Sequence, residues 1–185
     1  MNVYDFDKTV FYPDSSAKFI AHCAARYPVP VCAALLRALP RLVPYLLGGR
    51  RDATRLKERI FSFLPHVDDA EREVRSFWNA NMDRVGEWYK KRRRDSDVII
   101  TGSPEFLLTP AAETMGFHLI GTRMDIKTGR IDGLNCGGRE KLRRFREAYP
   151  DATPEEFYSD SGSDAPMAAL SRRAYKVKKG IVSEW

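Results

Sequence analysis

The sequence predicts an α/β protein, with a parallel sheet flanked by helices and an all-helical insert after the first strand. Three observations predict this class. Short runs of apolar or β-prone residues at 2–5, 97–101 and 156–160 each end in a polar residue, as buried strands do. Helical patterns separate these runs, which is typical of a parallel sheet. From about residue 13 to residue 94, helical patterns follow one another without a strand pattern.

The insert is predicted to consist of several helices. Apolar residues recur at steps of three and four over residues 67–88, which predicts an amphipathic helix with Trp78 and Trp88 in packing roles. Prolines are predicted to divide the region into short helices: Pro28, Pro30, Pro40, Pro44 and Pro65. Because the insert follows the first strand directly, we expect it to lie over that strand's carboxyl end as a lid.

The later elements complete the sheet. Residues 119–134 are predicted to form a hairpin around the turn Lys127, Thr128 and Gly129. Residues 174–177 predict a further short strand, with which residues 181–185 can pair. In a parallel sheet, ligands bind beyond the carboxyl ends of the strands, so the polar ends of the first three strands are expected to meet in one crevice.

Composition and charge narrow the class of partner. The chain has 185 residues of which 43% are hydrophobic, enough for a core, and this excludes global disorder. Its net charge is +6, with basic clusters at 49–51, 90–94, 139–146 and 176–179. A nucleic-acid groove is one interpretation, but no aromatic-rich basic pattern of an RNA platform accompanies the charge, and no nucleic-acid partner is expected. Solvated helix faces, or a field that attracts a phosphorylated substrate, fit better.

Two features bear on location. Cys23, Cys32 and Cys136 are odd in number and lack metal-ligand spacing, and no signal-peptide pattern precedes the first strand, so a reducing, cytoplasmic setting is expected. Residues 31–47 are the most apolar segment, yet they carry Arg37 and Arg41 and two prolines. They predict a buried or interfacial helix pair, and peripheral contact with an anionic membrane surface is the alternative.

The residues that carry chemistry begin with two carboxylates. Asp5 and Asp7 follow the first strand at a spacing that points both side chains the same way in an extended chain. Burying two like charges is costly unless a cation, usually a metal, offsets the cost. One carboxylate can then act as a nucleophile and the other as a proton donor. A solvated acidic turn is the alternative.

The second strand is followed by residues suited to an anion. Ser103 is a predicted N-cap, Pro104 suits a first helical position and Glu105 complements the helix dipole, so free main-chain N–H groups there would favour an anion. An ordinary helix start would explain Ser103 and Pro104 but not Thr101. Lys141 lies in a predicted first helical turn, where its charge is unfavourable unless a phosphate is close.

The third strand ends in a serine- and glycine-rich loop with two acids. Asp160 at the strand end and Asp164 four residues later can face one crevice, and such hard oxygen ligands suit Mg²⁺. A simple turn has the same composition. The three histidines, His22, His66 and His118, show no metal pairing and are expected to be structural or exposed.

Taken in order, these four segments resemble the motifs of the haloacid dehalogenase superfamily over nearly the whole chain. Residues 5–9 resemble its D-x-D-x-T motif, Thr101 its second-motif hydroxyl and Lys141 its third-motif lysine. Asp160 and Asp164 are similar to its fourth motif. The helical insert resembles the cap of the phosphoserine-phosphatase-like branch and of a bacterial branch that contains phosphatidylglycerophosphate phosphatase. The resemblance implies a Rossmann-like core of residues 1–12 and 95–185 with a helical cap of residues 13–94.

The resemblance also implies catalytic and metal-binding roles. Asp5 would attack phosphorus and carry the phosphoryl group, and Asp7 would protonate the leaving alcohol and then activate water. Asp5, Asp7 through its main-chain carbonyl, and Asp160 would bind Mg²⁺. Because members that act on carbon–halogen bonds typically lack the second acid, Asp7 indicates a phosphatase.

Further roles follow for the phosphate site. The resemblance implies that Thr101, Gly102 and Lys141 hold the phosphoryl oxygens and that Asp164 orients a metal-bound water or Lys141. Two departures remove no catalytic group: Lys8 and Ser159 occupy positions where the family more often has glycine.

The predicted function is therefore Mg²⁺-dependent hydrolysis of a small phosphate monoester. Two alternatives stay open at this point. One is a lipid phosphatase at a membrane surface with a phosphatidylglycerophosphate-like substrate, and the other is a catalytically retired domain that binds a phosphorylated ligand. The sequence selects neither a particular substrate nor an oligomeric state.

Overall fold

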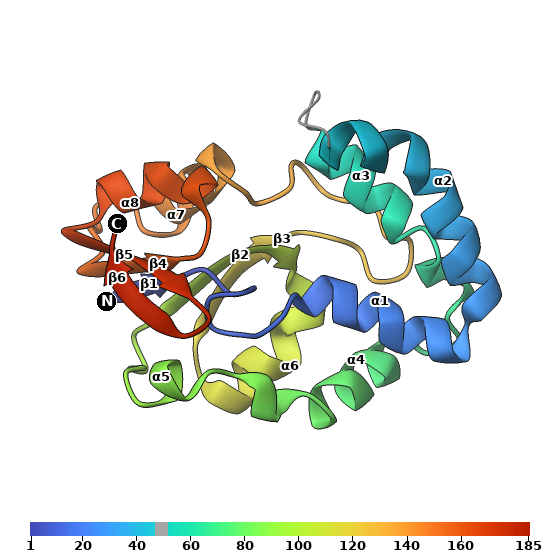
Figure 1. Cartoon of the computed structure of the whole chain (residues 1–185), viewed down its shortest axis with the longest axis horizontal. Helices are drawn as coiled ribbons and strands as arrows, with labels where there is room; N and C mark the ends of the chain where they lie inside the picture. Colours follow the sequence, from blue (N-terminus) through green and yellow to red (C-terminus); the bar gives the residue numbers. More distant parts are fainter. Residues whose placement is uncertain (47–51) are drawn as a thin grey trace.

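A six-stranded sheet in the order β3-β2-β1-β4-β5-β6 forms the centre of this computed structural model, which describes residues 1–46 and 52–185 (Figure 1). Its strands are β1 (Asn2–Tyr4), β2 (Val98–Pro104), β3 (His118–Thr122), β4 (Glu156–Ser159), β5 (Arg173–Lys178) and β6 (Ile181–Glu184). Pairs from β3 through β5 are parallel, and β6 pairs antiparallel with β5. The predicted α/β class and the predicted pairing of the last two strands are confirmed.

Helices account for the regular structure described between β1 and β2. They are α1 (Ser15–Arg26), α2 (Pro28–Leu46), α3 (Ala53–Ile60), α4 (Ala70–Asn79) and α5 (Glu87–Lys90), with 3₁₀ turns η1 (Leu64–His66) and η2 (Met82–Arg84). Aspartate side chains start three of them, because Asp14, Asp52 and Asp69 each accept a hydrogen bond from a main-chain N–H three residues on. The helical insert expected after the first strand is therefore present.

The remaining helices follow later strands. They are α6 (Glu105–Met115), α7 (Arg139–Ala148) and α8 (Ala165–Leu170), with a 3₁₀ turn η3 (Gly162–Asp164). Figure 1 shows α7 and α8 on one side of the sheet and α6 on the other. Helices on both faces bury both sides of the strands, as a parallel sheet requires.

One cluster of buried side chains joins the sheet to the insert. The Tyr4 ring of β1 stacks on Tyr158 with ring centroids 4.8 Å apart and meets Tyr89 of α5 edge-on at 5.0 Å. Trp78 of α4 is almost fully buried, and its indole N–H donates to the Leu107 carbonyl. Partly buried Trp88 packs against the same cluster. Both tryptophans therefore have the packing roles that the sequence predicted.

Two helix predictions are wrong in their boundaries. The helix expected over residues 67–88 ends at Asn79, where the Asn81 side chain donates to the Phe77 carbonyl, and Trp88 belongs to the separate α5. Pro40 and Pro44 lie inside α2 and do not end it. Both prolines are on the exposed side of that helix. A helix can bend there without disturbing the packed side.

The hairpin expected over residues 119–134 is wrong in its first arm. Those residues belong to β3, which pairs in parallel with β2 through partners such as Leu119 and Ile99. The turn itself exists, because Met124 and Ile131 form an isolated antiparallel bridge and Asp125 accepts hydrogen bonds from Lys127 and Thr128. The β-prone residues 119–122 are extended, as predicted, but they pair with β2 and not with a second arm of the hairpin.

Other predictions concern cysteines, histidines and the apolar segment. The three cysteines are free thiols, and His22 hydrogen-bonds Glu73 while His66 and His118 are exposed. Leu47 and the basic residues 49–51 lie outside the described residues. Over the part of the chain that is described, a helix long and apolar enough for a membrane crossing is not found.

Candidate active site

A cleft of about 350 Å³ opens at the carboxyl ends of β1, β2 and β4. These strands are neighbours in the sheet, so the polar residues that follow them reach the same edge, as predicted. All seven candidate residues line the cleft: Asp5, Asp7, Thr101, Gly102, Lys141, Asp160 and Asp164. The structure therefore brings together side chains that are up to 159 positions apart in the sequence.

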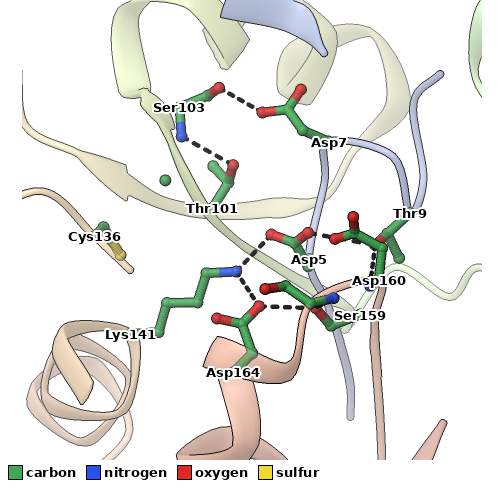
Figure 2. Close-up of polar contacts among 12 residues, drawn as sticks. Asp5, Asp7, Thr9, Thr101, Ser103, Cys136, Lys141, Ser159, Asp160 and Asp164 are labelled. Carbon is green, nitrogen blue, oxygen red and sulfur yellow. Dashed lines mark hydrogen bonds and ion pairs between the residues drawn. The ribbon is translucent and has the colours of Figure 1, made fainter. Parts of the chain in front are cut away.

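Of the two aspartates that follow β1, Asp5 is the less exposed to solvent. Its main-chain N–H donates to the Tyr158 carbonyl of β4 at 2.8 Å, which fixes the chain just beyond the strand. One carboxylate oxygen accepts from Lys141 Nζ at 2.5 Å and the other from the Thr9 hydroxyl at 3.3 Å (Figure 2). Burial raises the pKa of Asp5, and the ammonium of Lys141 counteracts this rise.

Asp7 has a separate set of partners. Its carboxylate accepts from the Ser103 hydroxyl at 2.5 Å and from the main-chain N–H of Ser15, the first residue of α1, at 2.6 Å. Burial raises the pKa of Asp7 and the charge of Asp14 adds to the rise, while the two donors lower it. Two carboxylates two residues apart thus lie in different environments, which suits different roles in one reaction.

Ser103 does not cap a helix, so that prediction is wrong. β2 continues to Pro104, and α6 begins at Glu105 without a side-chain cap. Ser103 is therefore still in the strand, and its hydroxyl contacts Asp7, Ser15 and Ser16. The sequence gives no signal for this role, because a serine followed by proline and glutamate is also the usual pattern of a helix N-cap.

A lysine of the insert contacts Gly102, near the end of β2. Lys57 of α3 donates its ammonium to the Gly102 carbonyl, and Thr101 Oγ1 accepts from the Ser103 N–H at 3.1 Å. Burial lowers the pKa of Lys57 to about 8, against the opposing effect of the Asp7 and Asp14 carboxylates. Lys57 lines the cleft. It was not predicted from the sequence, because α3 carries several basic residues and a lysine among them resembles an ordinary solvated side chain.

Lys141 joins two buried acids. Its ammonium donates to Asp5 and, at 2.7 Å, to Asp164, which also accepts from Ser159 Oγ at 2.8 Å. Burial by itself lowers the pKa of Lys141, but the charges of Asp5 and Asp164 outweigh this and raise it. Ser159, the last residue of β4, thus contributes a hydroxyl that holds Asp164.

Asp160 is held beside Asp5 through Thr9. The Thr9 hydroxyl donates to Asp5 and accepts from the Asp160 N–H at 2.9 Å, so one side chain ties the loop after β1 to the loop after β4 (Figure 2). Loss of solvent raises the pKa of Asp160, and nearby Lys8 counteracts this rise. The Asp160 side chain remains exposed at the cleft.

These groups form an oxygen-rich set at one end of the cleft. Within residues 1–46 and 52–185, no group of three or more histidine, cysteine, aspartate and glutamate side chains could hold a metal ion. The predicted Mg²⁺ set needs only two carboxylates, those of Asp5 and Asp160, with the main-chain carbonyl of Asp7. No donor among the described residues reaches that carbonyl. The carboxylates of Asp5 and Asp160 and the carbonyl of Asp7 belong to residues that line one cleft, and oxygen donors of this kind fit a hard cation that retains water.

Lys8 has a main-chain conformation that favours glycine. Its φ is 60°, in the left-handed region that costs a side-chain-bearing residue about 1–2 kcal/mol. We expect Lys8→Gly to raise the free energy of unfolding by about 0.5–1 kcal/mol, because glycine removes that strain but adds freedom to the unfolded chain. Urea unfolding measures the change. Lys179→Gly is the matched control, because Lys179 has a φ of 51° far from the cleft; a loss of stability in both variants would contradict the strain argument.

Known proteins are similar to this chain in sequence and in fold. A family model described as haloacid dehalogenase-like hydrolase matches residues 3–169. Protein CicA of Caulobacter vibrioides is 30% identical over 96% of this chain and 86% of its own. A protein of unknown function from Bordetella pertussis Tohama I has a similar structure, with a TM-score of 0.77 at 20% identity, covering 94% of this chain and 87% of the other. A phosphoserine phosphohydrolase-like protein from Francisella tularensis has a TM-score of 0.60 at 14% sequence identity. The match covers 94% of this chain and 86% of the other.

Proposed function

The chain belongs to the haloacid dehalogenase-like hydrolases, and we propose that it is a Mg²⁺-dependent phosphatase that hydrolyses a phosphate monoester through an aspartyl-phosphate on Asp5. The observation that carries the proposal is the pair of acids after β1. Asp5 is held by Lys141 and Thr9 on the cleft wall, and Asp7 is held by Ser103 and Ser15. A nucleophile and a proton donor are thus oriented by different groups.

In the first step, a carboxylate oxygen of Asp5 forms a bond to phosphorus while the ester P–O bond breaks. Asp7 gives its proton to the departing alkoxide, which leaves as the alcohol. The raised pKa of Asp7 suits this role, because burial makes the carboxyl group hold its proton to a higher pH than an exposed aspartate does.

In the second step, Asp7 takes a proton from water as the water oxygen attacks phosphorus. The bond between phosphorus and Asp5 breaks, which restores the Asp5 carboxylate and releases inorganic phosphate. Thr101, Gly102 and Lys141 hold the phosphoryl oxygens in both steps, and Asp164 keeps the Lys141 ammonium in place. Most of the catalytic effect comes from position and charge.

Asp5, Asp160 and the Asp7 carbonyl are the groups that would hold Mg²⁺. When bound, the ion supplies positive charge that offsets the negative charge of the phosphoryl group. Among the described residues, three lysines line the cleft, Lys8, Lys57 and Lys141, and Lys141 is already paired with Asp5 and Asp164.

We further propose that residues 1–12 and 95–185 form the catalytic core and residues 13–94 a cap that selects a small phosphorylated substrate. Tyr45 of α2 and Lys57 of α3 line the cleft from the insert. Because Lys57 contacts Gly102 of β2 from the insert side of the cleft, the leaving group would meet this cation. The Francisella protein's description as phosphoserine phosphohydrolase-like makes a small, charged phosphate ester a reasonable first substrate class.

The test is to stop the reaction between the two steps. The Asp7→Asn variant, given radiolabelled p-nitrophenyl phosphate and Mg²⁺, is expected to become labelled on the chain and to release phosphate at least about a hundredfold more slowly than the wild type. Nitrophenolate leaves without a proton, so the first step needs Asp7 less than the second does. Label that is found on the chain should be absent from the double variant Asp5→Asn/Asp7→Asn.

Two results would count against the proposal. Absence of turnover by the folded wild type over a broad panel of phosphate esters would favour a retired phosphate-binding domain. Label that persists in the double variant would place the nucleophile elsewhere.

A further inference from the structure

Helix α2 presents several leucine and valine side chains to solvent, while two of the three buried residues described in it are alanines. Its exposed residues include Val29, Leu36, Leu39 and Val43, which keep between 44% and 78% of their surface. The buried residues of the same helix are Val31, Ala34 and Ala38. An isolated surface helix of a soluble domain has the opposite arrangement. The exposed apolar side chains therefore call for an external partner.

The exposed residues form one continuous stripe. Steps of three, four and seven residues separate Val29, Leu36, Leu39 and Val43, so they lie on one face of the helix. The opposite face packs against α1 and α3. Figure 1 shows α2 at the outer edge of the molecule, away from the sheet. A flat surface can reach the stripe without disturbing the fold.

Charge along the stripe has one sign. Helix α2 contains no acidic residue, and Arg37 and Arg41 follow one flank of the stripe. Arg59 of α3 donates to the Arg37 carbonyl at 3.5 Å, which joins this flank to the next helix. An apolar face with arginines along its border is the pattern of a helix that lies in a membrane interface.

A concavity beside the same flank adds to the positive charge. It has a volume of about 760 Å³ between α2, α3 and the turn at 128–130. Four guanidinium groups line it, from Arg41, Arg55, Arg59 and Arg130. Its one lining acid, among the described residues, is Glu58, which accepts from the Ile131 N–H. Guanidinium groups bind phosphate oxygens in pairs of hydrogen bonds.

We infer that the α2 stripe and the arginine concavity form a docking surface for an anionic lipid bilayer. The apolar stripe would enter the boundary between headgroups and acyl chains, and the arginines would contact lipid phosphates. A second copy of the chain fits less well, because two such surfaces facing each other would bring their arginines together. The inference does not depend on which ester the cleft hydrolyses.

The test is co-sedimentation of the full chain with vesicles. We expect binding to vesicles of phosphatidylcholine that contain phosphatidylglycerol, little binding to phosphatidylcholine alone, and release by high salt. Leu36→Ser/Leu39→Ser should lower the partition coefficient by at least about tenfold. Arg37→Gln/Arg41→Gln should lower it by roughly fivefold per arginine, and only on the anionic vesicles.

Matched controls separate this surface from general stickiness. Ile181 is 73% exposed on β6, so Ile181→Ser removes a comparable apolar side chain elsewhere and should leave binding unchanged. Lys178 is also exposed on the sheet, so Lys178→Gln removes a positive charge away from α2 and should likewise leave binding unchanged. Hydrolysis of p-nitrophenyl phosphate in solution should be equal in all four variants, which shows that they are folded.

Three outcomes would overturn the inference. The wild type could stay in the supernatant with anionic vesicles at low salt, or the leucine variant could bind as well as Ile181→Ser. The third is a wild-type dimer in light scattering that the leucine variant converts to monomer, which would assign the stripe to a second copy of the chain.

Discussion

Replacement of Asp5 by asparagine is expected to reduce hydrolysis of p-nitrophenyl phosphate by at least about a thousandfold. The amide keeps the shape of the carboxylate but has no anionic oxygen to attack phosphorus. It also keeps an acceptor for Lys141, whose ammonium still has Asp164 at 2.7 Å. Initial rates at saturating Mg²⁺ and ester measure the loss, with wild type and variant at equal concentration of folded protein.

The fold should survive this change, which makes the result specific to chemistry. Lys141 keeps Asp164 as its charged partner, so the loss of the Asp5 charge leaves no buried ammonium unpaired. We expect the free energy of unfolding of Asp5→Asn to lie within about 1 kcal/mol of wild type. Asp151→Asn is the matched control, because Asp151 is exposed in the turn after α7. If Asp5→Asn kept a tenth of the wild-type rate, a different group would have to be the nucleophile.

The sheet and the positions of the acids could be predicted from the sequence because local signals coincide there. The runs at 2–5, 97–101 and 156–160 each end in a polar residue and fall on β1, β2 and β4, and parallel topology alone brings those residues to one edge. Asp5, Thr101 and Asp160 therefore converge without any long-range information. Lys141 lies in the first turn of α7, as predicted, and its ammonium, which is unfavourable at that end of a helix, pairs with Asp5 and Asp164 at the strand ends.

The parts that failed depend on contacts between distant segments. Ser103 looks like a helix cap until α1 places Ser15 and Ser16 beside it. From the sequence, Lys57 is indistinguishable from a solvated lysine; only the packing of α3 brings its ammonium to the Gly102 carbonyl. The first arm of the expected hairpin is extended as predicted, yet its partner is β2. In each case local propensity left two outcomes of similar energy, and tertiary packing selected one.

The second large effect is expected from Lys141→Met, which should damage stability and catalysis together. Lys141 is 3% exposed and is the ammonium that pairs with both Asp5 and Asp164. Methionine fills similar space but leaves two buried carboxylates without a cation, and breaking a buried ion pair costs about 3–5 kcal/mol. Urea unfolding without Mg²⁺ measures the free-energy loss. The rate with p-nitrophenyl phosphate should fall at least about a hundredfold, because the phosphoryl oxygens lose a charged donor.

Arg143→Met gives the comparison on the same helix. Arg143 is 59% exposed and pairs with Glu140 and Glu147 at the surface, so its loss should change the free energy of unfolding by less than about 0.5 kcal/mol and leave the rate unchanged. The two variants remove the same type of charge from positions two residues apart. A Lys141→Met protein that unfolds at the same urea concentration as Arg143→Met would mean that Asp5 and Asp164 are not charged partners of Lys141, and the electrostatic account of the cleft would then fail.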